Sequence, residues 1–309
     1  MTTLVSVIMP AKNAGKYIKK SIESIINQDY SNFELIIIND NSTDNTLEVI
    51  NQFNDKRIHV LTGNGAGIAD AFNLGLENAK GKFFCRCDSD DLYPLDRLTI
   101  QVDWLEKNPN YIAVCGMYSA IDNKGRHLVQ YLREAASQNI DNYFRKGQTI
   151  THFCTFMTKT VELEKLGGCR PFFVTGEDID LQLRLSELGS IFFLPVNVYF
   201  YRLHNFSITH TQPNATREFY EQLARDCHKQ RLDGLKDKVD MRSDIIFPQI
   251  EDKPRTSDNK IINQMISESW YWHRKKNKGK AFFSALKIIR FFPLKLNVWR
   301  NVILVIFKA

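Results

Sequence analysis

The sequence predicts an α/β protein with a central sheet flanked by helices, followed by a helical C-terminal region. Two observations indicate this fold class. Short apolar, often β-branched runs alternate with segments of helical periodicity as far as about residue 210, the pattern of strand–helix–strand units around a largely parallel sheet. Beyond that point the alternation stops, and the remaining segments are polar, basic or amphipathic. We therefore expect an α/β domain over 1–210, a helix and linker over 211–258, and a basic amphipathic helical region over 259–309.

Each expected element follows from its local pattern. Residues 33–38 form a largely apolar run that ends in three β-branched isoleucines, which is typical of a strand buried on both faces of a parallel sheet. In residues 16–28, apolar side chains recur on one helical face. Pro10 is expected to end the first strand. Strands are expected at 4–9, 33–38, 58–61, 82–87, 112–116, 154–157, 191–194 and 198–201, and helices at 16–28, 67–79, 95–107, 177–188 and 214–236.

The composition is that of a globular protein. Hydrophobic residues make up 43% and charged residues 25% of the chain, which excludes extensive disorder. The apolar run at the N-terminus is too short for a signal peptide. The six cysteines lack the paired CxxC spacing of a zinc site, so we expect free thiols in a reducing cytoplasm.

Charge is distributed unevenly between the body and the tail. From residue 269 to the end there are ten Lys or Arg and no Asp or Glu, whereas the first 268 residues carry 31 basic and 35 acidic residues. Such asymmetry indicates contact with a polyanionic surface. Trp and Tyr at 270–272, beside the basic residues, favour a membrane–water interface. Insertion of aromatic side chains would add to the affinity, and those expected to insert are Trp270, Trp272, Phe282, Phe283, Phe291, Phe292 and Trp299. Nucleic acid is not expected, because no reader motif accompanies the charge. A helical subdomain with a solvated basic face remains the alternative.

An acidic cluster, Asp88-Ser89-Asp90-Asp91, follows the strand expected at 82–87. Carboxylates this close together repel one another, and a divalent cation would remove that cost. Alternation in a short turn lets Asp88 and Asp90 point to one side, which suits a metal ion that bridges the two phosphates of a nucleotide diphosphate. The alternative is an acidic loop that caps the next helix.

Two further residues are candidates for chemistry. Asp178 lies at the expected start of a helix, where a carboxylate is also a good capping residue. A carboxylate that faces the acidic cluster is also a natural candidate for a general base. His204 closely follows a strand and is either a metal ligand or structural. The stretch 63–67 matches the dinucleotide fingerprint only in broken form, and no phosphate-binding GKS or GKT loop occurs, which disfavours a Rossmann oxidoreductase.

Four segments, in this order, resemble family 2 glycosyltransferases of the GT-A fold. They are "VSVIMPAKNAGKYIKKSIESIINQDYSNFELIIINDNSTDNT", "GIADAFNLGLENAKGKFFCRCDSDDLYPLDRL" with its DXD motif, "GEDIDLQLRLSELG" and "YRLHNFSIT". The resemblance covers about residues 3–210 and implies the GT-A sheet, a mixed Rossmann-like sheet. The QxxRW motif of processive synthases is absent from the sequence, so we expect one sugar added per event.

The resemblance implies roles for individual residues. Asp178 would be the catalytic base, with Glu177 on the acceptor side. Asp90 would bind the metal, and His204 is a candidate second ligand. Asn41 stands where the family has Gly, and Asn tolerates a positive φ. Asp40 would hydrogen-bond the nucleobase. The other residues expected to bind the nucleotide sugar are Pro10, Ala11, Lys12, Asn13, Asp70, Asn73, Arg86, Asp88 and Ser89.

These assignments predict an inverting, metal-dependent glycosyltransferase. It would use Mn²⁺ or Mg²⁺ and transfer a hexosyl or N-acetylhexosaminyl group from a nucleotide sugar, expected to be a UDP-sugar. The acceptor would be a saccharide or lipid-linked saccharide in surface polysaccharide synthesis. Residues 270–309 would hold the enzyme on the cytoplasmic face of an anionic membrane. The alternatives are a nucleotidyltransferase and a non-catalytic nucleotide-sugar-binding protein.

Overall fold

The computed structural model describes residues 2–131, 136–204, 214–242, 245, 247 and 257–307. The chain divides into two compact units. The first consists of Met1–Tyr118, Leu132–Tyr201 and Asn214–Asp252, and the second of Ser119–Tyr131, Arg202–Pro213 and Lys253–Ala309.

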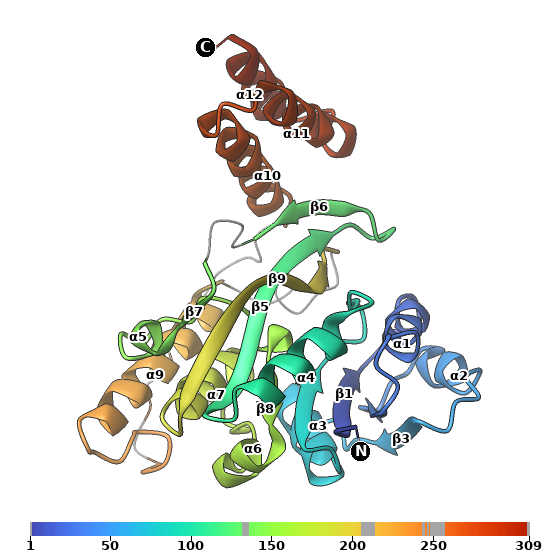
Figure 1. Cartoon of the computed structure of the whole chain (residues 1–309), viewed down its shortest axis with the longest axis vertical. Coiled ribbons are helices and arrows are strands. Elements are labelled where there is room, and N and C mark those ends of the chain that lie inside the picture. Colours follow the sequence, from blue (N-terminus) through green and yellow to red (C-terminus); the bar gives the residue numbers. More distant parts are fainter. Residues whose placement is uncertain are drawn as a thin grey trace. The chain divides into compact units, whose positions relative to one another are not determined.

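Strands and helices alternate through the first unit as the sequence predicts (Figure 1). The strands are β1 (Val5–Ala11), β2 (Phe33–Asn39), β3 (Ile58–Thr62), β4 (Phe83–Arg86), β5 (Tyr111–Ile121), β6 (His127–Gln130), β7 (Gln138–Asn139), β8 (Met157–Lys159) and β9 (Ser190–Arg202). The helices are α1 (Ile18–Ile26), α2 (Thr46–Ile50), α3 (Ile68–Glu77), α4 (Arg97–Lys107), α5 (Asp141–Phe144), the 3₁₀ helix η1 (Phe153–Thr155), α6 (Thr160–Leu166), α7 (Glu177–Ser186), α9 (Asn214–Leu232), α10 (Ser257–Arg274), α11 (Lys278–Phe291) and α12 (Leu296–Phe307).

The described strands form one mixed sheet in the order β3-β2-β1-β4-β8-β5-β9-β7, with β6 paired to the end of β5. β1 to β4 are parallel to their neighbours in this group, whereas β8 is antiparallel to both β4 and β5. Ala11 lies opposite Asn39, and Asn39 lies opposite Thr62. Three parallel strands therefore end at the same level on one edge of the sheet.

Helices cover both faces of this sheet. Alternate residues of a strand point to opposite faces, and β1 follows this rule: Val7 and Met9 pack into one apolar cluster and Ile8 into the other. The first cluster includes residues of α1, α2 and α4, and the second includes residues of α3, α6, α7 and α9. Both faces of the parallel strands are buried, so β1 and β2 are mostly apolar. Of their buried polar residues, Ser6 donates a hydrogen bond to Glu34 at 2.6 Å.

Pro10 does not end β1, contrary to the sequence-based expectation, because β1 continues to Ala11 and pairs with β2 throughout. The carbonyl of Ile8 accepts a hydrogen bond from Cys87 on the β4 side. Alternate residues of a strand point the same way, so the nitrogen of Pro10 faces that side too, beyond the last β4 pair at Arg86. No ladder hydrogen bond is lost at that position.

Other predicted elements also have different bounds. The strand expected at 154–157 is η1 followed by β8, and the two strands expected at 191–194 and 198–201 are the single strand β9. Pro195 lies exposed within β9 without interrupting it. β6, β7, α5 and α6 were not predicted. Helix α9, which falls in the range expected to be a helix and linker, belongs to the first compact unit.

The second unit has small cores of its own. Ile262, Met265, Ile288 and Val298 are buried together with residues of β6. A further cluster joins Ala281 and Ala285 of α11 to two valines of α12. Most of the aromatic residues in this region, including Trp270 and Trp272, pack against these clusters. Among the described residues, no helix has the length and apolar character needed to cross a membrane.

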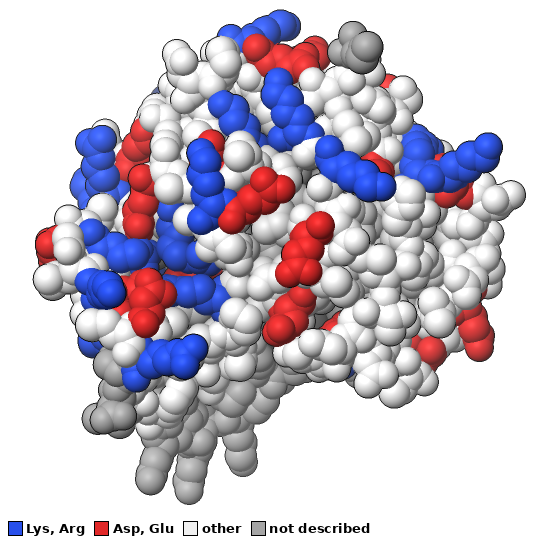
Figure 2. All heavy atoms as spheres, turned by 90° about the horizontal axis from the view of Figure 1, so that it is seen from below, with Lys and Arg blue, Asp and Glu red and all other residues white. Residues whose placement is uncertain are grey.

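Figure 2 shows a face of the molecule on which acidic and basic side chains are interspersed, separated by uncharged areas. This mixture agrees with the nearly balanced charge of the first 268 residues.

Candidate active site

The carboxyl ends of β1, β2 and β4 provide one edge of the sheet, and most of the predicted site residues follow them. Ala11 is level with Asn39, and Arg86 at the end of β4 is level with Ile8. Pro10 and Ala11 are buried within β1, so they shape the edge without offering polar side chains. In open α/β sheets, ligands bind at the carboxyl ends of the strands.

Asp40, directly after β2, is almost completely buried, with 3% of its surface exposed. Its Oδ1 accepts a hydrogen bond from the amide of Gly65 at 2.7 Å. Its Oδ2 lies 3.8 Å from Nζ of the exposed Lys12. A Cβ on Gly63 would lie 2.6 Å from Oδ1 of Asp40, so this approach requires glycine. Asp40 therefore joins the loops that follow β1, β2 and β3.

Two asparagines with left-handed backbone conformations shape these loops. Asn13 has a φ of 52° and Asn41 a φ of 56°, so the expectation that Asn41 tolerates a positive φ is confirmed. The amide of Asn13 donates to Oγ of Ser42 at 3.0 Å, and its Oδ1 accepts from the amide of Thr43 at 2.8 Å. Asn13 thus ties together the loops after β1 and β2. Its contact with a nucleoside stays a prediction.

The acidic cluster forms a turn directly after β4. The amide of Asp91 donates to the carbonyl of Asp88 at 3.1 Å, and the amide of Asp88 donates to Oη of Tyr199 at 3.0 Å. Ser89 is buried within the turn, and its carbonyl accepts from Oγ of Ser21. Asp88 and Asp90 are half-buried. The backbone of the cluster is therefore held at both ends.

Arg86 connects this cluster to the start of α7. The arginine is buried, with 4% of its surface exposed. Its Nε donates to Oδ1 of Asp88 at 2.7 Å, and its Nη1 donates to Oε1 of Glu177 at 3.2 Å. One guanidinium group therefore binds a carboxylate from each of two elements, and Glu177 is 91 residues away from it in the chain. The sequence assigned Arg86 to the nucleotide sugar, whereas both of these contacts are with protein carboxylates.

Two adjacent carboxylates at the start of α7 have different environments. Gly176, in the left-handed conformation with a φ of 72°, precedes them. Glu177 is buried, and Asp178 is half-buried. Burial, reinforced by the charge of Asp178, raises the pKa of Glu177 to about 7, although Arg86 acts in the opposite direction. Among the described residues, Asp178 accepts no hydrogen bond. Asp178 is therefore the carboxylate that a ligand can approach.

A buried ion-pair network, which sequence reasoning missed, fixes α7. Asp180 is fully buried and accepts from Nε of Arg184 at 2.9 Å and from Nε of Arg170 at 3.0 Å. Arg170 also donates through Nη1 to Asp237 at 2.8 Å. The i,i+4 spacing of Asp180 and Arg184 is a signal that the sequence contains. The contact with Asp237 bridges 67 residues and leaves no such local pattern.

On α3, Asp70 and Asn73 differ in availability. Both polar atoms of Asn73 bind the backbone of Cys169: Nδ2 donates to its carbonyl at 2.9 Å, and Oδ1 accepts from its amide at 2.8 Å. Asn73 therefore joins α3 to the segment before α7, and its predicted contact with the donor sugar stays a prediction. Asp70 lies half-buried in the first turn of α3, with no hydrogen-bond or ion-pair partner among the described residues.

The carboxylates present fit a cation that arrives with a nucleotide. Among the described residues, no three His, Cys, Asp or Glu side chains form a group that could hold a metal ion. Mg²⁺ bound with a nucleotide typically takes one or two protein carboxylates, with phosphate oxygens and water completing its shell. Asp88 is paired with Arg86. The assignment of Asp90 as a metal ligand stays a prediction from the acidic motif. His204 belongs to the second unit, next to residues 205–213 outside the described part, and its role stays a prediction.

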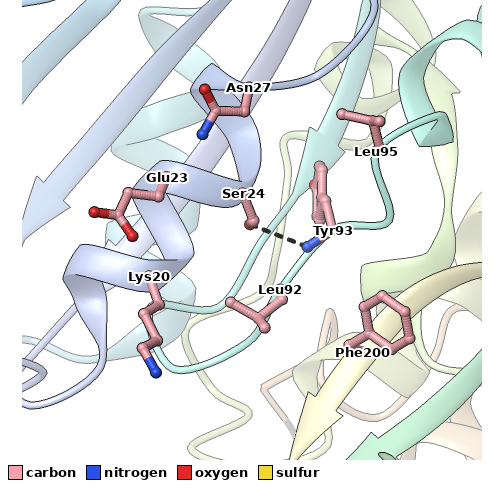
Figure 3. A pocket seen from close by; sticks show the side chains of 8 residues that line it. All are labelled: Lys20, Glu23, Ser24, Asn27, Leu92, Tyr93, Leu95 and Phe200. Atoms are coloured by element: carbon pink, nitrogen blue, oxygen red, sulfur yellow. Dashed lines mark hydrogen bonds between the residues drawn. The ribbon is translucent and has the colours of Figure 1, made fainter. Parts of the chain in front are cut away.

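A shallow pocket of about 330 Å³ lies beside the acidic turn (Figure 3). One side of the pocket is formed by α1 and its C-terminal end, through Lys20, Glu23, Ser24 and Asn27. The other side comes mainly from apolar side chains that follow the acidic cluster or belong to β9, namely Leu92, Tyr93, Leu95 and Phe200. Ser24 Oγ accepts a hydrogen bond from the amide of Tyr93. None of the predicted site residues lines this pocket, so it is distinct from the sheet edge.

The sheet and the polar edge together define a nucleotide-sugar transferase of the GT-A type, and the comparisons with known proteins agree. The family model "Glycosyl transferase family 2" matches residues 6–163. A glycosyltransferase of Rickettsia prowazekii, itself uncharacterized, is 31% identical over 221 residues, which cover 70% of this chain and 69% of that protein. The chain belongs to glycosyltransferase family 2.

Other relatives carry more specific names. The Escherichia coli protein WfgD, named as a UDP-Glc:α-D-GlcNAc-diphosphoundecaprenol β-1,3-glucosyltransferase, is 41% identical over 121 residues, or 39% of this chain and 47% of that protein. Among solved structures, S. aureus TarS 1–349 in complex with UDP has a TM-score of 0.59 at 19% identity, covering 73% of this chain and 65% of that chain. TarS in complex with UDP-GlcNAc has a TM-score of 0.57 at 16% identity and covers 94% and 92%. At these identities the structural likeness establishes the GT-A fold.

Proposed function

We propose that this family 2 glycosyltransferase is an inverting, metal-dependent enzyme that transfers a sugar from a UDP-sugar to a hydroxyl group of a lipid-linked saccharide. One observation carries the proposal. Arg86 binds Asp88 of the acidic cluster and Glu177 at the start of α7. A diphosphate at the acidic cluster and an acceptor hydroxyl at Asp178 would therefore lie on either side of one guanidinium group.

The donor would bind along the carboxyl edge of the parallel strands. Asp40 offers an oxygen that can accept the N3–H of uracil, and Lys12 beside it supplies a positive charge. Asp70, in the first turn of α3, would accept hydrogen bonds from sugar or ribose hydroxyls. The assignment of UDP is supported by the UDP and UDP-GlcNAc complexes of TarS and by the name of the E. coli relative. The remaining pocket would be formed by Pro10, Ala11, Asn13, Asp88 and Ser89.

Asp178 is the proposed general base. It would take the proton from the acceptor hydroxyl as the oxygen attacks the anomeric carbon. The bond between that carbon and the diphosphate oxygen breaks at the same time, and the nucleoside diphosphate leaves. Glu177 is unsuited to this role because its carboxylate is buried and bound to Arg86. A single base without a second carboxylate nucleophile favours one displacement and inverted configuration.

Mn²⁺ or Mg²⁺ would be held by Asp90 together with the donor's phosphate oxygens. When bound, the cation offsets negative charge on the departing diphosphate. Neither His204 nor Asp88 is needed for this arrangement.

The acceptor proposal rests on the E. coli relative, whose name specifies a diphosphoundecaprenol-linked sugar. An acceptor of that kind is held in a membrane, and the enzyme would work as a peripheral protein at the cytoplasmic face. Family membership favours glycosyl transfer over a nucleotidyltransferase or a non-catalytic binding protein. No feature of the described residues favours nucleic acid as a partner.

Donor binding tests the nucleotide assignment directly. Titration calorimetry with UDP, GDP and dTDP in the presence of Mn²⁺ should give the highest affinity for UDP. Asp40→Asn should weaken UDP binding, while Asp29→Asn, a control outside the sheet edge, should not. Clear preference for GDP would refute the assignment of a UDP-sugar.

Metal dependence is tested with the same protein. Chelation should abolish sugar transfer, and Mn²⁺ or Mg²⁺ should restore it. Asp90→Asn should lower the affinity for UDP with Mn²⁺ but change little without metal. Undiminished transfer by Asp90→Asn in the presence of chelator would show that the metal role is wrong.

A further inference from the structure

Helix α12 is apolar on two opposite faces. Val298, Val302 and Val305 are buried against the rest of the second unit. The other face carries four apolar residues at successive spacings of three, four and four, which place them in one line along the helix. These residues, which we call the outer stripe, are Leu296, Trp299, Ile303 and Phe307, exposed by 85%, 47%, 54% and 78%.

Such a stripe is unusual on a helix that faces only water. A surface helix normally has one apolar stripe, toward its core, and polar residues on the other side. The outer stripe is extended by Leu294, 93% exposed in the turn before α12. On α11, Phe283 and Leu286 are also exposed, whereas Ala281 and Ala285 are buried. Contiguous exposed apolar residues of this kind mark a surface that contacts a partner.

The charge around the outer stripe has one sign. From residue 269 onward the chain contains ten Lys or Arg and no Asp or Glu. Arg290, Lys295 and Arg300 are exposed beside or within the segments that carry the exposed apolar residues. An apolar stripe bordered by cations matches a bilayer whose surface is anionic.

A second copy of this chain is a poorer occupant. A two-fold dimer places the same patch of both copies face to face. The cations around one outer stripe would then meet those around the other, with no carboxylate from residues 269–309 to compensate. An anionic lipid surface covers the same apolar groups and attracts the same charges.

We propose that the outer stripe of α12, with Leu294, is the surface by which this enzyme binds an anionic membrane. α12 has twelve residues and a length of about 18 Å, so it would lie in the plane of the interface. The inference rests on the proposed function and deepens it, because it names the contact that brings the enzyme to a lipid-linked acceptor. Membrane binding itself does not depend on Asp178.

This assignment differs from the sequence-based expectation that the aromatic side chains of the tail insert. Trp270, Trp272 and Phe282 pack partly buried around α11 and α12, and Phe291 and Phe292 pack against the other small core. Of the aromatic residues considered from the sequence, only Phe283 and Trp299 are exposed. The other residues of the outer stripe and Leu294 are mostly aliphatic, and the sequence pattern alone did not predict that they would be exposed.

Co-sedimentation of the full-length protein with vesicles tests the proposal. Vesicles of phosphatidylcholine with about 30% phosphatidylglycerol should bind the protein at low salt and partly release it at about 0.5 M NaCl. Ile303→Ser/Phe307→Ser should lower binding by more than about tenfold. The matched control Leu47→Ser/Val161→Ser, which removes apolar residues exposed on the first unit, should bind as the wild type does.

Two further measurements separate the outcomes. Asp178→Asn should lose sugar transfer but bind vesicles as the wild type does. A variant that keeps full transfer and still binds vesicles is a failure of the proposed function only. Circular dichroism checks that each variant is folded. Wild-type protein that ignores anionic vesicles, or a folded stripe variant that binds them undiminished, overturns the membrane surface. A wild-type dimer that the stripe substitution converts to a monomer, without a change in vesicle binding, also overturns it in favour of a second copy.

Discussion

The two units of this protein break the usual separation of polar and apolar residues in opposite ways. In the first unit, charged residues are buried: Arg86, Glu177 and Asp180 have at most 7% of their surface exposed. In the second unit, apolar residues lie outside, along the outer stripe of α12. Both arrangements cost stability unless something compensates. In the first unit the compensating partners are within the protein, whereas the partner that we propose for the outer stripe is a membrane.

This difference separates residues that maintain the site from residues that meet a ligand. Arg86 and Asp180 have their charges matched by ion-pair partners, so changing them should first affect folding. Among the described residues, Asp178 has no hydrogen-bond partner and the outer stripe has no apolar cover. Changing them should therefore first affect chemistry or binding. The comparison predicts that variants in the two classes fail in different assays.

The largest effect is expected for Asp178→Asn. The amide keeps the shape of the side chain but cannot take the acceptor's proton, so kcat should fall by about 10²–10⁴. Donor binding, measured by calorimetry, and the urea midpoint should stay near the wild-type values, because Asp178 is half-buried and supports no other residue. The control is Glu177→Gln at its buried neighbour. A greater loss of kcat in Glu177→Gln than in Asp178→Asn would reverse the two roles.

Arg86→Met is expected to destabilise the protein by about 3–5 kcal/mol. Removing the guanidinium leaves Glu177 buried without its partner, and breaking a buried ion pair from one side has this typical cost. Urea unfolding at pH 8 measures the loss. In the double variant Arg86→Met/Glu177→Gln, no buried charge is orphaned at Glu177, so part of the stability should return. A double variant no more stable than Arg86→Met would show that Arg86 does not act through Glu177.

A smaller, pH-dependent effect is expected from Glu177 itself. Its pKa in the folded chain, about 7, lies above the ordinary value of 4.5. The unfolded chain therefore loses this proton first, and the free energy of unfolding should fall as the pH rises from about 4.5 to about 7. Glu177→Gln should lack this contribution, so its stability relative to wild type should rise over that range. A pH-independent difference would mean that Glu177 titrates normally.

The smallest effect should come from the outer stripe. Ile303→Ala should change the free energy of unfolding in solution by less than about 0.5 kcal/mol, because the side chain faces water in the isolated protein. Its sequence neighbour Val302 is buried, so Val302→Ala should cost about 2 kcal/mol. Urea unfolding followed by circular dichroism measures both. Equal losses would mean that Ile303 is covered within the protein.

The sequence predicted the parallel half of the fold well and the antiparallel half poorly. β1, β2 and β4 are short apolar runs that end in polar residues, and that pattern is local. β8 has three residues and lies between β4 and β5, so its place depends on contacts far along the chain. The prediction that Pro10 ends β1 was wrong, because a proline interrupts a strand only where its nitrogen faces a strand that needs a hydrogen bond.

For the site, the sequence identified the residues better than their partners. Asp88, Asp90 and Asp178 follow recognisable motifs, and their roles stay predictions. The sequence did not predict that the amide of Asn73 binds the backbone of Cys169. The partner of each polar group depends on segments that come together only when the chain folds, as the Arg86–Glu177 contact illustrates.

Each unit contains its own reporter group: buried thiols in the first unit and most of the tryptophans in the second. All six cysteines are free, buried and confined to the first unit, and burial raises the pKa of Cys115 and Cys154 above the ordinary range. Three of the four tryptophans, Trp270, Trp272 and Trp299, belong to the second unit. A thiol-specific reagent therefore reports opening of the sheet domain, while indole fluorescence reports mainly on the helices of the second unit. The native chain thus allows the two halves to be followed separately in one cuvette without labels.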